Sequence, residues 1–299
     1  MKSEIPVYDI STISGFKRKD ILVSRLGLYA KRHLNLRYAH RHNFYHLVLF
    51  TQGSGNHSID FLNYRVKAYQ IYFMIPGQVH SWDFDEDIDG YVVNFSGSFF
   101  QSFLLRSNYL EDFSFFHGAV KDSVIDVPDE CRIEIKDHFE DILKEGNDSK
   151  QFSADFIRLL LLKIFILISR FTEGKKENLT TSYNYTLLKN FQQLIEKNFT
   201  NLRLPKEYAE LLYITPNHLN ALCNDLLGVS AGEVIRNRIS LEAKRLLINM
   251  ELSISEIAYQ LNFSDNSYFT KFFKKQAGVT PDEFRKKTLN KYKNEKSES

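Results

Sequence analysis

The chain has 299 residues, and its 39 Lys and Arg against 37 Asp and Glu give a formal net charge of +2. This length allows one or two domains with a sizeable core, and the near balance of charge excludes a uniformly basic or acidic protein. Two cysteines in separate segments, Cys131 and Cys223, exclude a disulfide framework and favour a reducing cytoplasm, and the first ten residues contain no apolar run typical of a signal peptide.

The amino-terminal third is predicted to be rich in β-strands. Residues 1–35 are mixed, with one short strand expected at Leu26–Tyr29, and residues 36–96 contain short runs of Val, Ile, Phe and Tyr separated by turn residues. The strands expected in this region are Tyr45–Thr51, Asn56–Phe61, Tyr64–Lys67, Ile71–Ile75, His80–Phe84 and Tyr91–Phe95. Many short strands at close spacing predict a β-barrel or a jelly roll.

Two helices are predicted after the strands. Asp129–Glu145 has an amphipathic pattern, and Ser153–Phe171 is apolar nearly all round. Basic residues leave the second helix without an uncharged apolar run of the ~18–20 residues needed to cross a bilayer, so no membrane segment is expected. A helix this apolar must be buried on more than one side. We expect it to pack on the strands and on a second copy of the chain; burial within one chain alone is the alternative.

A polar, unpatterned stretch, 173–184, predicts a linker between two domains. Beyond it, Tyr185–Phe199 has apolar residues at helical spacing and predicts the first helix of a second domain, which we expect to end near residue 290, before a basic tail at 291–299. A basic cluster, 285–287, lies just before that end. It predicts either phosphate contacts or a solvated, frayed tail.

The stretch 253–285 predicts a helix-turn-helix. Ser253 and Glu256 form a capping box, Asn262 suits the left-handed end of the first helix, and Ser264 can cap the second. The inward face of the second helix would consist of Phe269, Phe272 and Phe273. Its amides, hydroxyls and lysines would then point outward, where they suit base edges and phosphates. The alternative is an ordinary amphipathic helix pair with a solvated polar face.

The same pattern occurs earlier in the chain, which favours the DNA-binding interpretation. Ala209 corresponds to Ala258, and the segment 228–233 corresponds to 278–283, each with a glycine helix end followed by a capping box. Between the two copies, Ala231–Met250 contains helically spaced apolar residues and predicts a rod of roughly 28 Å. Such a rod could hold two recognition helices about one DNA turn apart, roughly 34 Å.

Residues 185–287 resemble the DNA-binding domain of AraC/XylS-type transcription regulators. The resemblance rests on the string SISEIAYQLNFSDNSYF at 253–269, followed by FFKK at 272–275 and GVTP at 278–281. It implies DNA contacts from Asn217, His218 and Asn220 in the first recognition helix and from Asn266, Ser267, Tyr268, Thr270, Lys271 and Lys274 in the second. Ala221 and the pair Asn224–Asp225 depart from the family pattern, so the first recognition helix is expected to be poor in phosphate-neutralising charge.

Residues 20–115 resemble the small cupin barrel that serves as the N-terminal sensor of many such regulators, through the segments AHRHNFYHLVLFTQGSG and FMIPGQVHSW. The resemblance implies an α+β fold: a cupin-like sensor and dimerisation domain at 1–172, with its helices at 127–172, and an all-α domain of two helix-turn-helix units at 185–290.

Histidines in the cupin-like segments raise the question of a metal. They parallel cupin metal ligands, His40 and His42 would share one face of a strand, and imidazoles suit transition metals. However, His46 replaces the usual glutamate, and the sensors of this family mostly lack a metal, so we expect none. The residues expected to line an effector pocket are His40, His42, Tyr45, His46, His80, Trp82 and Tyr91. Packing in the core is the alternative for each of them.

The sequence therefore predicts a cytoplasmic, dimeric transcription regulator without enzymatic activity or cofactor. Its expected partners are double-stranded DNA, a small-molecule effector and a second copy that pairs through helices 129–172, with RNA polymerase as a further candidate. One alternative is a metal-dependent cupin enzyme with an appended DNA-binding module. Another is a constitutive DNA-binding protein whose barrel only builds the dimer.

Overall fold

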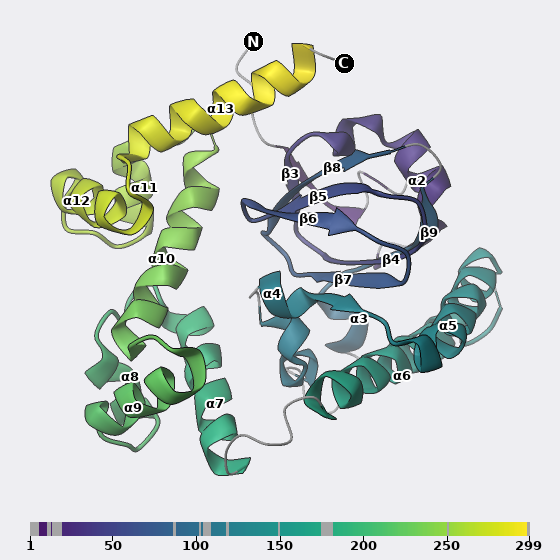
Figure 1. Ribbon diagram of the computed structural model, residues 1–299, viewed down its shortest axis with the longest axis horizontal. Helices are drawn as coiled ribbons and strands as arrows, with labels where there is room; N and C mark the ends of the chain where they lie inside the picture. Colours follow the sequence, from purple (N-terminus) through teal and green to yellow (C-terminus); the bar gives the residue numbers. More distant parts are fainter. Residues whose placement is uncertain are drawn as a thin grey trace. The chain divides into compact units, whose positions relative to one another are not determined.

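The computed structural model describes residues 6–10, 13, 20–85, 88–101, 103, 109–117, 120–148, 150–174, 182–249 and 251–297. The chain divides into two compact units (Figure 1). The N-terminal unit covers residues 6–177, and the C-terminal unit consists chiefly of residues 178–299. This division agrees with the predicted order of a strand-rich domain followed by a helical one.

Ten strands form two five-stranded sheets in the described part of the N-terminal unit. One sheet has the order β1 (Val7–Tyr8), β3 (His40–His42), β8 (Val79–Phe84), β5 (Gly55–Ile59) and β6 (Leu62–Val66). The other has the order β10 (Val124–Asp126), β7 (Gln70–Met74), β4 (Tyr45–Gln52), β9 (Asp89–Phe95) and β2 (Ile21–Arg25). The α+β class and all six expected strands are confirmed. The described strands form two sheets, however, and not one continuous closed barrel.

Residues alternate between two cores along β4 and β9. Leu47, Leu49 and Val93 pack with the helices that cover one side of their sheet. Val48 and Val92 belong to a second core on the opposite face, between the sheets. This alternation is the ordinary consequence of the two-residue period of a strand. It decides which side chains can reach the interior of the unit.

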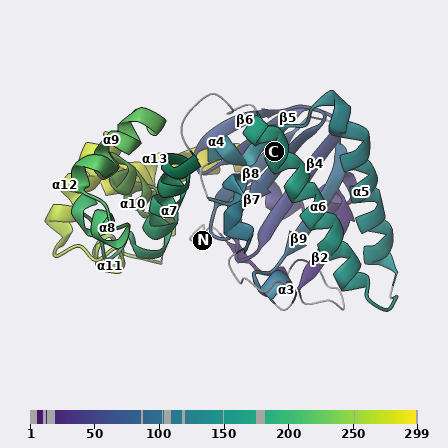
Figure 2. The ribbon, with the colours of Figure 1, turned by 90° about the horizontal axis from the view of Figure 1, so that it is seen from below.

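Helices α5 (Asp129–Asn147) and α6 (Ser153–Gly174) lie side by side along the sheet that contains β4 and β9 (Figure 2). The expected packing of the second helix on the strands is confirmed, because Leu161, Phe165 and Ile168 are fully buried in the first core. In the part of the chain that the structure describes, no helix is both long and apolar enough to cross a membrane.

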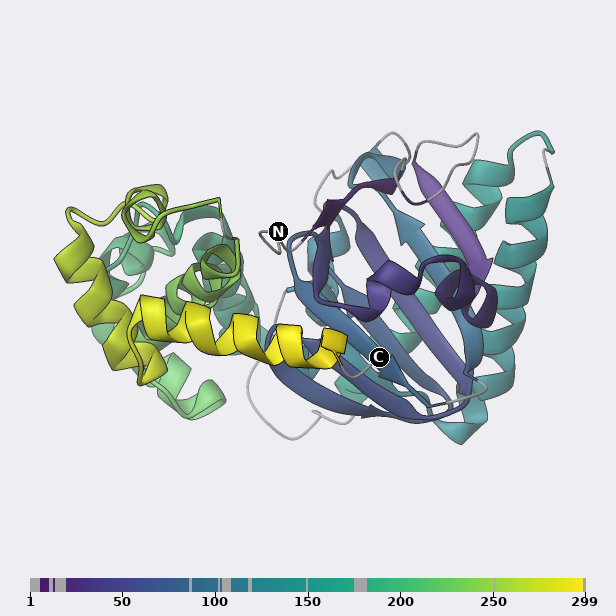
Figure 3. The same ribbon diagram turned by 90° about the horizontal axis from the view of Figure 1, so that it is seen from above.

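The strand predicted at Leu26–Tyr29 is wrong. These residues begin helix α2 (Leu26–Arg32), and the strand β2 ends immediately before them. Leu26 and Tyr29 are both buried and lie three residues apart, so they share one helix face. In Figure 3 the dark purple helical segment that includes α2 lies on the side of the strands opposite to the teal helices α5 and α6.

The segment between β9 and α5 contains elements that were not predicted. The short helices there are α3 (Ser98–Gln101), η2 (Tyr109–Asp112), η3 (Ser114–Phe116) and α4 (Val120–Ser123), and a further short helix, η1 (Leu34–Arg37), follows α2. Phe100, Phe115 and Phe116 from this segment are buried in the core beneath α6. The segment therefore completes the packing between the sheet and α6.

Seven helices form the described part of the C-terminal unit. They are α7 (Ser182–Asn198), α8 (Pro205–Leu211), α9 (Pro216–Leu227), α10 (Ala231–Leu247), α11 (Ile254–Gln260), α12 (Asn266–Ala277) and α13 (Pro281–Ser297). Figure 1 shows α8 and α9 near one end of α10 and α11 and α12 near the other. At 17 residues, α10 is about 25 Å long. One core, with Ile235, Ile239 and Ala243 of α10 at its centre, joins the two helix pairs.

The helix bounds of this unit differ from the expected domain limits. Helix α7 begins at Ser182, three residues before the expected start, and the middle of the predicted linker, 175–181, lies outside the described residues. Helix α13 continues to Ser297, so the expected domain end near residue 290 falls inside a helix.

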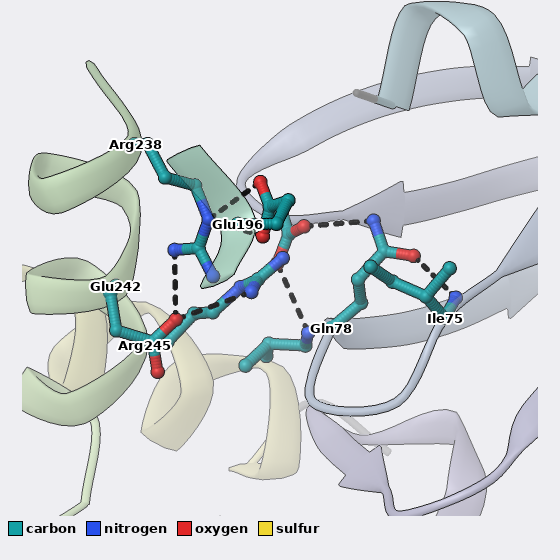
Figure 4. A network of polar contacts seen from close by, with 8 residues as sticks. Ile75, Gln78, Glu196, Arg238, Glu242 and Arg245 are labelled. Atoms are coloured by element: carbon teal, nitrogen blue, oxygen red, sulfur yellow. Dashed lines mark hydrogen bonds and ion pairs between the residues drawn. The ribbon is translucent and has the colours of Figure 1, made fainter. Parts of the chain in front are cut away.

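An ion-pair network fixes α7 against α10 (Figure 4). The Arg238 guanidinium donates to the Glu196 carboxylate of α7 at 2.8 Å and to Glu242 at 3.0 Å, and Arg245 lies 3.4 Å from Glu242. Arg238 also stacks on the Phe199 ring, 4.0 Å from its centroid. The first helix of the unit is thereby held on the rod by contacts that span 42 residues of sequence.

Candidate nucleic-acid interface and buried histidine cluster

The second helix-turn-helix is built by local hydrogen bonds. The Glu256 amide donates to the Ser253 hydroxyl at 3.1 Å, and the Ser253 amide donates to the Glu256 carboxylate at 2.7 Å, so the predicted capping box is present. Asn262 adopts the expected left-handed conformation, with φ 56°. The cap of α12 differs from the prediction: Asp265 accepts from the Tyr268 amide at 2.7 Å, while Ser264 donates to the Asp265 carboxylate.

The negative charge of the Asp265 carboxylate explains this correction. An ionised oxygen accepts a stronger hydrogen bond than a hydroxyl oxygen does, and it is attracted to the positive end of the helix dipole. The hydrogen bond from the Tyr268 amide lowers the pKa of Asp265. The helix therefore starts at Asn266.

One face of α12 is buried and the other is open. Phe269 and Phe273 are fully buried, and Phe272 is partly buried against the same core, as predicted. The predicted DNA-contacting residues on the exposed face are Asn266, Ser267, Tyr268, Lys271 and Lys274, with Thr270 half-buried beside them. None of the five exposed side chains lies beneath the rest of the described protein.

Helix α9 repeats this construction with different side chains. Thr215 accepts from the His218 amide at 3.1 Å, and Asn217 and His218 are exposed. Asn220 is half-buried, and its Oδ1 accepts from the Ala231 amide at 3.0 Å, which ties α9 to the start of α10. That oxygen is thus engaged within the protein, and its predicted contact with a base stays a prediction.

The two recognition helices differ in charge. Helix α12 carries Lys271, Lys274 and Lys275 on exposed positions, whereas the sequence of α9 contains no Lys or Arg. Cations near phosphates supply sequence-independent affinity for nucleic acid. Of the two helices, α12 is the one equipped for it.

Two arginines support the interface without belonging to its exposed face. Arg203 was not singled out from the sequence. Its guanidinium lies 4.0 Å from the Phe263 ring centroid and donates to the carbonyl oxygens of Leu261 and Asn262, so it fastens the segment before α8 to the turn before α12. Arg285 donates to the carbonyl oxygens of Leu247, at 2.9 Å, and Leu252, at 2.7 Å. Arg285, the first residue of the predicted basic cluster, therefore binds carbonyl oxygens at and after the C-terminal end of α10.

Five histidines form a buried cluster between the two sheets of the N-terminal unit, hereafter the histidine cluster. It consists of His40 and His42 on β3, His46 on β4, His57 on β5 and His80 on β8, each at most 3% exposed. The predicted shared face of His40 and His42 is confirmed. His57 was not predicted, although its strand alternates buried and exposed residues; nothing in that local pattern distinguishes it from an ordinary core position.

Hydrogen bonds assign the protons within the histidine cluster. The Trp82 indole N–H, which can only donate, lies 2.9 Å from His57 Nε2, so that nitrogen is an acceptor. His80 Nδ1, 3.0 Å away, must then donate to it. The remaining nitrogen of neutral His80, Nε2, is an acceptor for His42 Nε2 at 2.9 Å. One tryptophan thus fixes the tautomers of three histidines.

The other two histidines are oriented from outside the cluster. His40 Nδ1 lies 2.8 Å from the Tyr38 carbonyl oxygen, which only accepts. His46 Nδ1 lies 2.5 Å from Asn94 Oδ1, and the Asn94 amide donates to the Tyr29 hydroxyl. Both rings therefore carry their proton on Nδ1. Their Nε2 atoms are buried acceptors without a hydrogen-bond partner among the described residues.

Burial keeps the histidine cluster uncharged near neutral pH. Desolvation lowers the pKa of His40 to about 3 and that of His46 to about 4. It also holds the pKa values of His42, His57 and His80 well below the usual value. Neutral imidazoles offer a lone pair, so the cluster can accept hydrogen bonds or bind a metal.

Two of the predicted pocket residues do not face this interior. Tyr45 stacks on Phe95, with ring centroids 5.0 Å apart, and Tyr91 stacks on Phe139 of α5. Both belong to the core beneath the helices, because their positions on β4 and β9 have the opposite parity to His46 and Asn94. They are corrected to core residues of the helix side. Trp82 does reach the histidines.

A cavity of about 410 Å³ opens beside Trp82 in the N-terminal unit. Its wall comes from α2, η1 and the ends of β4, β8 and β9. Trp82 and Phe84 supply apolar surface, and the wall carries charges of both signs, from Lys31, Arg37, Asp85 and Asp89. A volume of a few hundred Å³ is typical of a small-molecule site. The sequence did not indicate this cavity, since its lining residues are far apart along the chain.

Comparison with known proteins gives two matching family models. An AraC-like ligand binding domain matches residues 24–161, and a helix-turn-helix domain matches residues 208–287. The chain is 37% identical over 89 residues to the uncharacterized transcriptional regulatory protein YesN of Bacillus subtilis, covering 29% of this chain and 24% of that protein. It is 40% identical over 68 residues to the probable transcription factor PqrA of Proteus vulgaris, covering 23% of this chain and 56% of that protein.

These curated relatives are matched over less than two thirds of their own length. A solved structure of ToxT from Vibrio cholerae matches 89% of this chain and 98% of its own, with a TM-score of 0.44 and 15% identity. That likeness is too weak to inform function.

Proposed function

Since the chain belongs to the AraC-type regulators, with a ligand-binding domain followed by a helix-turn-helix domain, we propose that it is a transcription regulator that binds double-stranded DNA. The observation that carries the proposal is the exposed polar face of α12, which places Asn266, Lys271 and Lys274 in solvent above a buried aromatic face. A helix of this kind can enter a major groove.

Within this proposal the lysines and the amides have different tasks. Lys271 and Lys274 contribute affinity that is independent of sequence and falls with salt. Asn266 and Asn217 read base edges, and a well-formed bidentate contact discriminates by about 1–3 kcal/mol. The absence of Lys and Arg from α9 assigns most of the phosphate attraction of the two recognition helices to α12.

The effector would be a small molecule held in the cavity beside Trp82. Charges of both signs, from Lys31 and Arg37 and from Asp85 and Asp89, favour a polar or zwitterionic group, and Trp82 and Phe84 favour an apolar or aromatic part. Such a ligand regulates DNA binding only if it prefers one state of the protein over the other.

Homodimerisation through the helices 129–172 is part of the same proposal. Ile133 of α5 and Phe156 and Leu159 of α6 are 75%, 48% and 55% exposed. Exposed apolar side chains on neighbouring helices suit a self-complementary interface. A cytoplasmic location and contact with RNA polymerase complete the proposal and rest on the family alone.

Mapping the chromosomal sites bound by the full chain tests the DNA-binding function, followed by gel shifts on one such site. We expect Lys271→Ala to weaken binding to all sequences and Asn266→Ala to relax the choice of sequence. Lys197→Ala on α7 is the matched control, since it removes an exposed lysine away from both recognition helices. Wild-type protein that shows no preference for any mapped site over random DNA would refute the proposal.

A metal-dependent enzyme remains the competing function, because the histidine cluster could support one. It predicts substrate turnover that is lost in His42→Ala. The family models and the relatives described as regulators favour regulation.

A further inference from the structure

Against the expectation from the sequence that these histidines hold no metal, we propose that the N-terminal unit binds one divalent transition-metal ion, with Zn²⁺ as the first candidate, through the Nε2 atoms of His40, His42 and His80. The site would be a resident feature of the interior between the sheets. The proposal does not depend on DNA binding or on the identity of the effector.

The three histidines already have near-ligating geometry. One ligand nitrogen from each lies within 4.8 Å of the others, and all three residues are buried. His40 and His80 are directly opposite each other in the register of β3 and β8. His42 Nε2 and His80 Nε2 are 2.9 Å apart. Zn–N bonds of about 2.0–2.1 Å in a tetrahedral site place two ligand nitrogens roughly 3.3 Å apart, so small side-chain movements would suffice.

Outer hydrogen bonds hold two of these rings in the orientation that a metal needs. Ligating histidines usually donate the other ring N–H to an oxygen or to a further acceptor, which fixes the tautomer. His40 donates from Nδ1 to the Tyr38 carbonyl, and His80 donates from Nδ1 to His57 Nε2. Both therefore keep a lone pair on Nε2 that is available to a metal.

His42 is the ring that must change. Its Nε2 hydrogen now points to His80 Nε2. For the metal to bind, this hydrogen moves to Nδ1 of the same ring, and the imidazole stays neutral. The direct hydrogen bond between the two Nε2 atoms is then replaced by two metal–nitrogen bonds.

Unpartnered lone pairs give the second, independent reason for a metal. His40 Nε2 and His46 Nε2 are buried acceptors without a partner among the described residues. Leaving a buried polar atom unsatisfied costs about 1–3 kcal/mol. A cation would satisfy His40 directly. His46, whose ring centroid lies 4.9 Å from that of His42, is the nearest candidate for a fourth ligand.

The ligand atoms decide the class of metal. Imidazole nitrogens suit Zn²⁺, Cu²⁺, Ni²⁺ and Co²⁺, whereas Mg²⁺ and Ca²⁺ require oxygen ligands. The group of potential ligands found in the described residues contains histidines only. We therefore expect no response to Mg²⁺ or Ca²⁺.

The first test uses the tag-free, EDTA-treated and desalted wild-type chain. Zn²⁺ titration by calorimetry should saturate at one ion per chain. Co²⁺ should give the visible absorption bands of a tetrahedral or five-coordinate site. It should also quench the fluorescence of Trp82, the single tryptophan of the sequence, because the Trp82 indole is hydrogen-bonded to His57, which in turn is hydrogen-bonded to His80. Zn²⁺ should reverse both signals. Lack of saturable binding to the wild type would overturn the proposal.

Variants locate the site. His42→Ala and His80→Ala should weaken Zn²⁺ binding by at least about 100-fold, and His57→Ala, which removes only the outer partner, by about 10–100-fold. His117→Ala is the control, because His117 lies outside the cluster and contacts the Glu111 carbonyl oxygen. Unchanged affinity in His42→Ala and His80→Ala would refute the assignment. If these variants fail to fold, the Co²⁺ spectrum and the Trp82 signal of the wild type decide.

A gel shift with and without Zn²⁺ separates this inference from the proposed function. If the protein binds DNA sequence-specifically but takes up no metal, the proposed metal site is refuted and the proposed regulatory function is retained. Metal uptake by a protein that binds no DNA would do the reverse.

Discussion

Lowering the pH should unfold the N-terminal unit before the carboxylates titrate. Each of the five clustered histidines has a folded pKa below the value of about 6.5 that it has in an unfolded chain. Below pH 6.5 the unfolded state therefore binds more protons than the folded state. Stability from this source is fully present above about pH 6.5 and is lost as the pH falls toward the folded pKa values.

The size of the effect follows from the number of histidines. Below pH 6 each histidine contributes close to one proton of difference, which is worth about 1.4 kcal/mol per pH unit. Five together give roughly 7 kcal/mol per pH unit. Because domains are stable by only about 5–15 kcal/mol, we expect the N-terminal unit to unfold between pH 7 and pH 5.

Urea unfolding followed by Trp82 fluorescence at several pH values between 7.5 and 5.5, with EDTA present, measures this slope. His57→Gln should reduce it by about one proton, because it removes one of the five titrating rings. A wild-type slope of no more than one proton would show that the cluster is hydrated or already protonated in the folded state, and the reasoning would fail.

Three further predictions concern the C-terminal unit. Lys271→Ala should reduce the slope of log affinity against log salt by about 1, which gel shifts at several salt concentrations measure; an unchanged slope would place this lysine away from phosphates. Tyr213→Asn should stabilise the unit by roughly 1 kcal/mol in chemical denaturation followed by far-UV circular dichroism, because Tyr213 is 96% exposed yet left-handed, with φ 55°. Arg203→Ala should destabilise the unit by about 1.5–3 kcal/mol by the same method, since it removes charged hydrogen bonds to the carbonyl oxygens of Leu261 and Asn262.

The C-terminal unit could be predicted largely from sequence, because its signals are local. Capping residues, helix-ending glycines and apolar spacing all act within a few residues of one another. The errors are local too, such as the cap at Asp265 in place of Ser264. Arg203 was missed because its partners lie 58 and 59 residues away, and no pattern along the chain connects them.

The interior of the N-terminal unit was less predictable, because it depends on strand parity and pairing. Strands β4 and β9 are buried on both faces, so the sequence alternation does not tell which face meets the histidines. Tyr45 and Tyr91 were therefore assigned to the wrong side. His57 joins the cluster because β5 pairs with β8, which places it opposite Trp82 and within hydrogen-bond distance of His80, and the sequence alone does not show this pairing.

Comparison of the two helix-turn-helix motifs shows which residues are required for folding and which can vary. Both recognition helices have a capping side chain, Thr215 or Asp265, and both end at a left-handed glycine, Gly228 or Gly278. Folding places no such requirement on the exposed faces of the two helices, because a solvated side chain contributes little to packing. On that face α12 has three lysines, whereas α9 has no Lys or Arg. The two helix-turn-helix motifs therefore need not contribute equally to DNA binding. In the proposed DNA complex, α9 must depend on hydrogen bonds and shape, and α12 on charge as well.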